Sequence, residues 1–191
     1  MKKEKLLMSK IWFTSDLHLN NKNVIKYCNR PYADQYEMNK ALIENWNSKV
    51  EEDDTVYVLG DFIMGMADTI PDILAQLKGN IHLIRGNHDS DVKMDYYAKA
   101  GIPVSWMDTL SYKGKYFIMC HFPIENQQLF KCMVGDNSEI IFLYGHIHDN
   151  APHGYVNKTF HVGVDTNNYM PVDIETIYQE SLMEDSKNES C

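Results

Sequence analysis

Five short polar clusters hold the residues of this chain that could do chemistry, and each cluster lies where an apolar run ends. Their aspartate, asparagine and histidine side chains offer oxygen and nitrogen lone pairs, which divalent metals accept in proteins. Polar groups that follow buried strands meet at one edge of a sheet, so clusters far apart in the sequence can converge. The candidate metal ligands are Asp16, His18, Asp61, Asn87, His121, His146 and His148.

The mixture of donors indicates which metals would suit the site. Nitrogen and oxygen ligands without a thiolate favour Mn, Fe, Co, Ni or Zn over a dedicated Mg or Ca site, and seven donors are enough for two ions. The members of the pairs Asp16/His18 and His146/His148 are two residues apart, so an extended backbone would point both side chains the same way. Cys120 directly precedes a candidate histidine and would point to the opposite side, so it is left out of the site.

The apolar runs predict the elements that must position these residues. Strands are expected at 10–15, 55–59, 81–84, on both sides of a turn at 113–115, at 140–144 and within 155–164. Helices are expected at 35–50, 71–78, 92–100 and from 174, the first of them capped by Asp34 with Glu37 three residues on. Early βαβ units followed by strands predict an α/β (α+β) fold with two packed mixed β-sheets flanked by helices. A single doubly wound sheet is the alternative.

Length predicts one domain over residues 1–183, followed by a polar, frayed tail at 184–191. The acidic run at 51–54 is expected to be a solvated loop. No apolar run approaches the ~20 residues that span a bilayer, and the apolar stretch near the start is too short for a secretory signal. A cytoplasmic protein without a membrane partner is therefore expected. The cysteines lack Cys-x-x-Cys spacing, which predicts reduced thiols at Cys28, Cys120, Cys132 and Cys191.

The net charge of −9 argues against extended nucleic acid as a partner, because such a surface would be basic. A small phosphate ester held by metal ions remains compatible with this charge, since two divalent ions would add about +4 at the site. The oligomeric state is left open.

The ordered clusters resemble the signature of the calcineurin-like metallophosphoesterase superfamily, in its small single-domain prokaryotic or phage-type branch. They are Asp16-Leu17-His18, Gly60-Asp61, Gly86-Asn87-His88-Asp89, the later His121, and Gly145-His146-Ile147-His148. The resemblance covers residues 11–148 and implies the calcineurin-like sandwich. It implies that Asp16, His18 and His148 bind one metal, that Asn87, His121 and His146 bind the other, and that Asp61 bridges both. It places His88 beside the substrate, with Asp89 orienting or polarising it.

Metal chemistry predicts the reaction that such a site would catalyse. Two divalent ions, with manganese expected and Fe, Ni, Co or Zn as alternatives, would lower the pKa of a bridging water, and the hydroxide would attack phosphorus. His88 would act as general acid and protonate the leaving oxygen. The predicted enzyme is a metal-dependent phosphoesterase hydrolase acting on a small phosphate ester.

The residues after Asp61 bear on the substrate. Eukaryotic-type Ser/Thr phosphatases continue this motif to a phosphate-binding arginine, whereas here Phe62, Ile63 and Met64 follow. A protein phosphatase is therefore disfavoured. Of the substrates that remain, a phosphodiester is the expected one and a nucleotide-like phosphomonoester is the alternative. A non-catalytic metal-binding scaffold is a remote alternative. Arg85 is expected in an ion pair.

Specificity is expected to come from the loops at 19–23, 62–69, 123–137 and 149–155. Phe62, Phe122 and Tyr155 could stack on a base, although packing is the commoner role of such residues. His153 and His161 are left out of the site.

Overall fold

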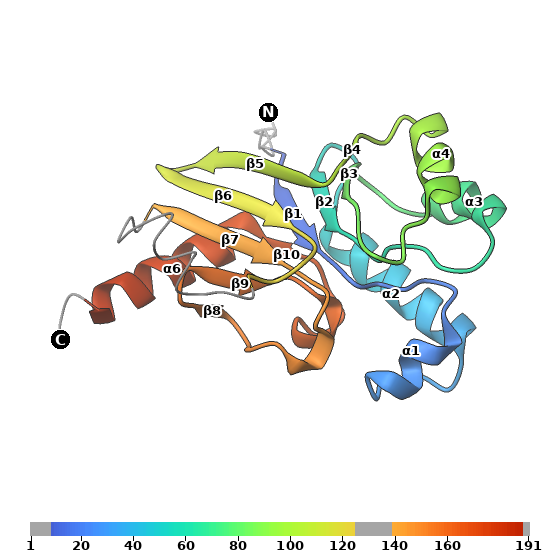
Figure 1. Cartoon of the computed structure of the whole chain (residues 1–191), viewed down its shortest axis with the longest axis horizontal. Coiled ribbons are helices and arrows are strands. Elements are labelled where there is room, and N and C mark those ends of the chain that lie inside the picture. The colour runs from blue at the N-terminus through green and yellow to red at the C-terminus, as the bar shows by residue number, and fades with distance from the viewer. Residues whose placement is uncertain (1–8, 125–138, 189–191) are drawn as a thin grey trace, which may run out of the picture.

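Two five-stranded sheets pack face to face in the computed structural model, which describes residues 9–124 and 139–188 (Figure 1). The first sheet has the order β10-β1-β2-β3-β4, in which β10 is antiparallel to β1 and the other pairs are parallel. The second has the order β5-β6-β7-β9-β8, with parallel pairs at β6–β7 and β7–β9 and antiparallel pairs at both edges. Both sheets are mixed, which confirms the predicted fold class.

The strand bounds follow the apolar runs closely. They are β1 (Ile11–Thr14), β2 (Thr55–Leu59), β3 (Asn80–Ile84), β4 (Val104–Ser105), β5 (Met107–Tyr112), β6 (Lys115–Cys120), β7 (Ile140–Tyr144), β8 (Tyr155–Val156), β9 (Thr159–His161) and β10 (Val172–Asp173). The helices are α1 (Lys22–Tyr27), α2 (Gln35–Lys49), α3 (Ile70–Leu74), α4 (Asp91–Lys99) and α6 (Ile174–Asn188), with 3-10 turns η1 (Ala67–Thr69), η2 (His148–Asn150) and η3 (Val164–Thr166).

Helix α2 begins as its sequence predicts. The Asp34 side chain accepts hydrogen bonds from the backbone N–H groups of Tyr36 and Glu37, which would otherwise lack partners in the first turn. Its apolar face buries Met38, Leu42 and Trp46 against the first sheet. The predicted cap and helical stripe are therefore confirmed.

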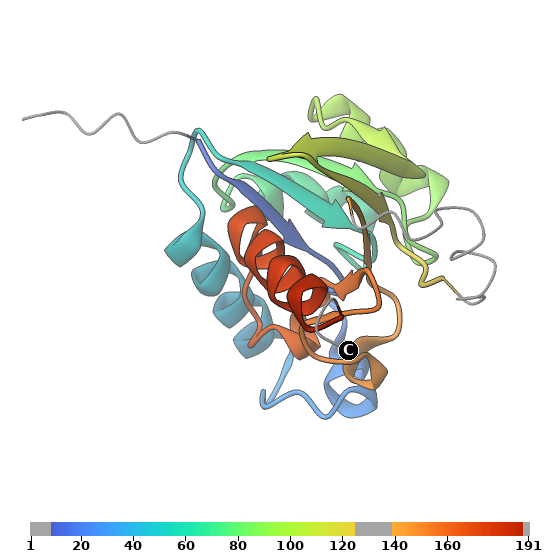
Figure 2. The same cartoon turned by 90° about the vertical axis from the view of Figure 1, so that its left-hand side faces the viewer.

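The first sheet is buried on both faces. One face meets α2, α3 and α4 in a cluster that includes Trp46, Ile70 and Tyr97. The other face meets the second sheet through Phe13 and Phe117, whose rings stack 6.3 Å apart, and meets α6 through Ile177. Figure 2 shows α6 lying along β1, and its contacts are with β1, β8 and β10. This double burial explains why β1, β2 and β3 read as nearly continuous apolar runs.

Several elements differ from the expectations. Strands β4 and β10 have two residues each, and α1 has six, so none of them carries a readable periodicity. Helix α3 ends at Leu74 rather than near residue 78. Helix α6 continues to Asn188, so residues 184–188, which were expected in the frayed tail, are helical, and 189–191 lie outside the described residues. Nowhere in the described ranges does a helix have the length and apolar character to cross a membrane.

The acidic run at 51–54 is only partly the expected solvated loop, because Asp54 is buried. Its carboxylate accepts hydrogen bonds from Lys10 N (2.7 Å), Trp12 Nε1 (2.8 Å) and Glu51 N (3.0 Å). Burial raises the pKa of Asp54, but these three hydrogen bonds outweigh burial and lower it below its usual value. Asp54 therefore ties the beginning of β1 to the beginning of β2.

Candidate metal centre

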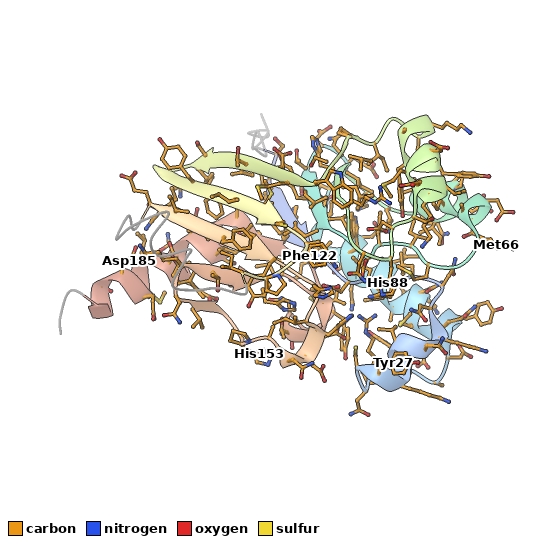
Figure 3. The ribbon with its side chains drawn as sticks, viewed as in Figure 1. Tyr27, Met66, His88, Phe122, His153 and Asp185 are labelled. Atoms are coloured by element: carbon orange, nitrogen blue, oxygen red, sulfur yellow. The ribbon has the colours of Figure 1, made fainter. Side chains whose placement is uncertain are left out.

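All seven candidate ligands lie together beyond the ends of five strands. Asp16 and His18 follow β1, Asp61 follows β2 and Asn87 follows β3. The remaining three come from the second sheet, with His121 after β6 and both His146 and His148 after β7. His88 also follows β3, and Figure 3 labels its side chain near the middle of the view.

The expected strand alternation does not explain how the paired ligands converge. Asp16 (φ 58°), His18 (φ 50°), His146 (φ 75°) and His148 (φ 50°) all have left-handed backbones, so neither pair lies on an extended strand. Asp61 (φ 52°) shares this conformation. Each such residue costs ~1–3 kcal/mol, and strain of this kind gathers at functional sites because the surrounding structure holds it there. The candidate ligands therefore lie on strained turns just past the strand ends.

One group of donors converges around Asn87. Its Oδ1 lies 2.9 Å from His121 Nε2 and 2.9 Å from His146 Nδ1, and these two nitrogens are 3.2 Å apart. His121 Nδ1 faces Leu59 O at 2.7 Å, which turns Nε2 toward the group. The turn at Gly60 (φ 85°) makes room for this ring, since a Cβ there would lie 2.5 Å from His121 Nδ1.

A second group converges around Asp16. His148 Nε2 lies 3.9 Å from Asp16 Oδ1, and Asp16, His18 and His148 each place one ligand atom within 4.8 Å of the others. Asp61 Oδ2 lies between the two groups, 3.5 Å from His18 Nε2 and 3.6 Å from His121 Nε2. This is the position that a bridging carboxylate requires.

Buried atoms without partners make the cluster suitable for a cation. Across residues 9–124 and 139–188, Asp16 Oδ1 and both ring nitrogens of His18 are buried and form no hydrogen bond. Burial raises the pKa of Asp16 and lowers that of His18 to about 2, which leaves the imidazole neutral with a free lone pair. Unsatisfied buried polar groups are costly, and a divalent ion would satisfy them. The residues present therefore fit a metal centre.

Asp165 and Arg30 form a supporting layer that the motif analysis does not identify. Asp165 Oδ2 lies 2.7 Å from His148 Nδ1, and Arg30 binds both carboxylate oxygens at 2.7 and 2.9 Å. Arg30 is 4% exposed and also donates to Asp16 O (2.6 Å) and Leu17 O (2.9 Å). It thus joins the turn after β1 to the histidine after β7. The Gly163-Val164-Asp165 sequence is a weak signal for the carboxylate, whereas no spacing marks Arg30.

The ion pair acts on the charge of His148. Burial alone would lower the pKa of its imidazole, but the hydrogen bond to Asp165, a second to Cys28 and the charge of Asp16 raise it to about 10. Burial likewise opposes the charge of Asp165, but hydrogen bonds to His148 and Arg30 lower its pKa overall. With Nδ1 held by Asp165, Nε2 is the nitrogen that faces Asp16, and a metal would bind there by displacing the Nε2 proton.

Asp89 has different partners from those expected. Its carboxylate accepts hydrogen bonds from Asp61 N (2.8 Å), Gly86 N (2.9 Å) and Phe62 N (3.4 Å), all of them backbone groups rather than the His88 ring. Burial raises its pKa. Asp89 therefore fixes the turns after β2 and β3 to each other, and the expectation that it orients His88 directly does not match this geometry.

His88 lies at the solvent side of the ligand group. Its side chain is 58% exposed, its Nε2 is 4.0 Å from Asp61 Oδ2, and its ring centroid is 5.5 Å from that of His18. Its backbone N–H donates to Asp61 Oδ1 at 2.9 Å. An exposed ring joined to a buried carboxylate in this way can contact a molecule that approaches the centre from solvent.

Other residues that the sequence singled out lie around the centre. Arg85 pairs with Asp91 at 2.6 Å and stacks on Trp106, which confirms the expected ion pair. Phe62 and Tyr155 are buried in the core, so packing is their role.

Phe122 remains at the surface, 40% exposed, with its ring centroid 4.9 Å from that of His146. Of the expected specificity loop at 123–137, residues 125–137 lie outside the described residues.

Comparison with known proteins agrees with this geometry. A family model described as calcineurin-like phosphoesterase matches residues 9–189. The uncharacterized protein MJ1445 of Methanocaldococcus jannaschii is 37% identical over 177 residues, which cover 89% of this chain and 90% of that protein.

Two solved structures share the fold. A protein of unknown function from Aquifex aeolicus, AQ665, superposes with a TM-score of 0.73 at 21% identity over 90% of this chain and 99% of that one. A structure described as a novel archaeal phosphodiesterase superposes with a TM-score of 0.51 at 17% identity over 86% and 98%. The predicted resemblance is confirmed, and the chain belongs to the calcineurin-like phosphoesterase family, whose members are metal-dependent.

Proposed function

We propose that this protein hydrolyses a small phosphate ester, preferably a phosphodiester, at a centre of two divalent ions. The observation that carries the proposal is the position of Asp61 between two donor groups, one of which contains buried atoms that form no hydrogen bond. Asp16, His18 and His148 would hold one ion, and Asn87, His121 and His146 would hold the other. Manganese is the expected metal, with Fe, Ni, Co and Zn as alternatives.

Two ions bound in this way would supply an activated water and would neutralise charge on the phosphoryl oxygens. The contribution of the chain itself is to fix the donors and to move a proton. His88 is the proposed general acid, because its ring is exposed beside the ligand group while its backbone is held by Asp61. A protonated ring there would donate to the leaving oxygen, a role that contributes ~10²–10⁴-fold in rate.

The charges around the centre favour a diester over a monoester. A monoester dianion carries one more negative charge, and it would need an additional cationic partner. Both arginines of the chain are in carboxylate pairs, Arg30 with Asp165 and Arg85 with Asp91, and buried Phe62 and Ile63 follow Asp61. An archaeal relative in fold is described as a phosphodiesterase, which agrees with this preference.

The test compares hydrolysis of bis-p-nitrophenyl phosphate and p-nitrophenyl phosphate by protein loaded with Mn, Fe, Co, Ni or Zn in turn. We expect the diester to have the higher kcat/KM and elemental analysis to give two ions per chain. The opposite preference would support the nucleotide-type monoesterase instead. Turnover of neither ester with any metal would refute the enzymatic proposal and favour a metal-binding scaffold.

A further inference from the structure

Lys93 is a buried lysine for which the proposed reaction has no use. It lies in the first turn of α4 and is 7% exposed. Its Nζ donates to the backbone carbonyl of His88 at 3.0 Å and lies 3.6 Å from Met64 Sδ. Burying an ammonium group costs free energy unless the group is paired, so a buried lysine here indicates that its hydrogen bond has a structural or functional role.

The hydrogen bond from Lys93 completes the attachment of the His88 peptide. The N–H of His88 donates to Asp61 Oδ1 at 2.9 Å, and its C=O accepts from Lys93 Nζ. The Asp89 carboxylate holds the same turn by accepting hydrogen bonds from Asp61 N and Gly86 N. The peptide of His88 is thus bound on both sides by buried ionisable side chains.

The ring of His88 has much weaker restraints than its peptide. Its side chain is 58% exposed, and within the described residues it faces the Asp61 carboxylate at 4.0 Å and the His18 ring, whose centroid is 5.5 Å away. The place of the ring relative to the ligand group is therefore set by its backbone. A displacement of about 1 Å in a reacting group can cost ~10²-fold in rate.

We propose that Lys93 is a positioning residue that holds the His88 peptide against Asp61, and so keeps the proton donor at a fixed place beside the metal centre. The catalytic consequence of this inference rests on the proposed function. The hydrogen bond between Lys93 and His88 is independent of that function. The Lys93 ammonium group contacts the backbone carbonyl of His88 and the Met64 sulfur, so it would act on the reaction through His88.

Lys93→Met tests this role because methionine keeps most of the buried stem and removes the donor. Lys99→Met is the matched control, since Lys99 is an exposed lysine at the end of the same helix. Phosphodiesters with leaving groups from p-nitrophenol to simple alcohols separate proton donation from the rest of catalysis, because only a poor leaving group needs a proton.

For Lys93→Met we expect kcat within about twofold of wild type on the nitrophenyl diester and about tenfold or more lower on alkyl diesters. Metal content should stay unchanged, and Lys99→Met should behave as wild type. Equal losses on both classes, a loss of metal, or no change on alkyl diesters would each overturn the proposal. If Lys93→Met does not fold, Lys93→Leu, which also lacks a donor, replaces it, with the same expected pattern.

The hydrogen-exchange rate of the His88 amide in the metal-loaded protein is a second measurement, and it does not depend on turnover. The His88 amide should exchange about tenfold faster or more in Lys93→Met than in wild type or Lys99→Met, because the peptide loses one of its two anchors. Unchanged protection would overturn the positioning role even if the wild type hydrolysed no ester. Absence of wild-type turnover with altered protection would instead refute the proposed function alone.

Discussion

Replacing Arg30 with methionine is expected to destabilise the protein more than any surface change. Arg30 is 4% exposed and donates to both oxygens of Asp165 and to the carbonyls of Asp16 and Leu17. Methionine would keep the stem but leave the Asp165 carboxylate buried beside unsatisfied carbonyls. Removing one partner of a buried pair costs ~3–5 kcal/mol. For a chain of this length each kcal/mol lowers Tm by about 2–4 °C, so Tm should fall by roughly 6–20 °C.

The assay is thermal unfolding followed by circular dichroism in buffer with a chelator, so that metal binding does not contribute. Arg85→Met is the control, because Arg85 is partly exposed and pairs with an exposed carboxylate; its loss should cost about 2 kcal/mol or less. The double variant Arg30→Met/Asp165→Asn should regain part of the lost Tm, because it removes a buried carboxylate that only His148 would still pair in Arg30→Met. A Tm for Arg30→Met within about 2 °C of wild type would refute the reasoning.

The same pair should govern metal affinity through His148. Asp165→Asn removes the carboxylate that binds His148 Nδ1 at 2.7 Å, and changes of this kind weaken metal binding ~10–100-fold. Isothermal titration calorimetry with Mn²⁺ would measure the change in metal affinity. Unaltered affinity would show that His148 does not depend on Asp165 for its orientation.

Three further variants test separate parts of the structure. His88→Asn should keep both ions and lose ~10²–10⁴-fold in kcat on poor leaving groups; full activity there would rule out proton donation. Asp61→Ala should lose metal together with activity, while Asp95→Ala, an exposed carboxylate on α4, should not; two ions retained by Asp61→Ala would contradict bridging. Asp54→Asn should cost ~1–3 kcal/mol at neutral pH in urea unfolding. Because the folded pKa of Asp54 is lowered, its stabilisation is present above the unfolded value of ~3.9 and is lost as pH falls through the folded pKa. The difference from wild type should therefore shrink in acid, and a constant difference down to about pH 2 would contradict this assignment.

Residue type and order were sufficient to select seven candidate ligands that the fold brings together, because histidine, aspartate and asparagine where buried runs end have few other uses in such a pattern. They were not sufficient to describe how the ligands are presented. Strand alternation predicted that Asp16 and His18 point the same way. In the structure both residues have left-handed backbones instead, and their residue types do not predict that conformation. Local sequence reports a preferred conformation, and here the tertiary surroundings override it.

The supporting residues were harder to find for a different reason. Arg30 and Asp165 are 135 positions apart, and their pairing depends on how the two sheets pack. Strands β4 and β10 are too short to show a period. The resemblance predicted that Asp89 orients or polarises His88, whereas its carboxylate accepts hydrogen bonds from backbone N–H groups that only the folded turns bring within reach.

Each of the two ligand sets draws donors from both sheets. His148 reaches the first set from β7, while Asn87 reaches the second from β3. An ion in either set would therefore act as a cross-link across the sandwich, with its binding free energy added to the adhesion between the sheets. Metal ions would hold the two sheets together at the end where they bind. The stacked rings of Phe13 and Phe117 hold the sheets together in the hydrophobic core. A substitution that weakens this aromatic contact would change the position of one sheet relative to the other. The distances between donors would then change in both ligand sets, so metal binding depends on the packing between the sheets.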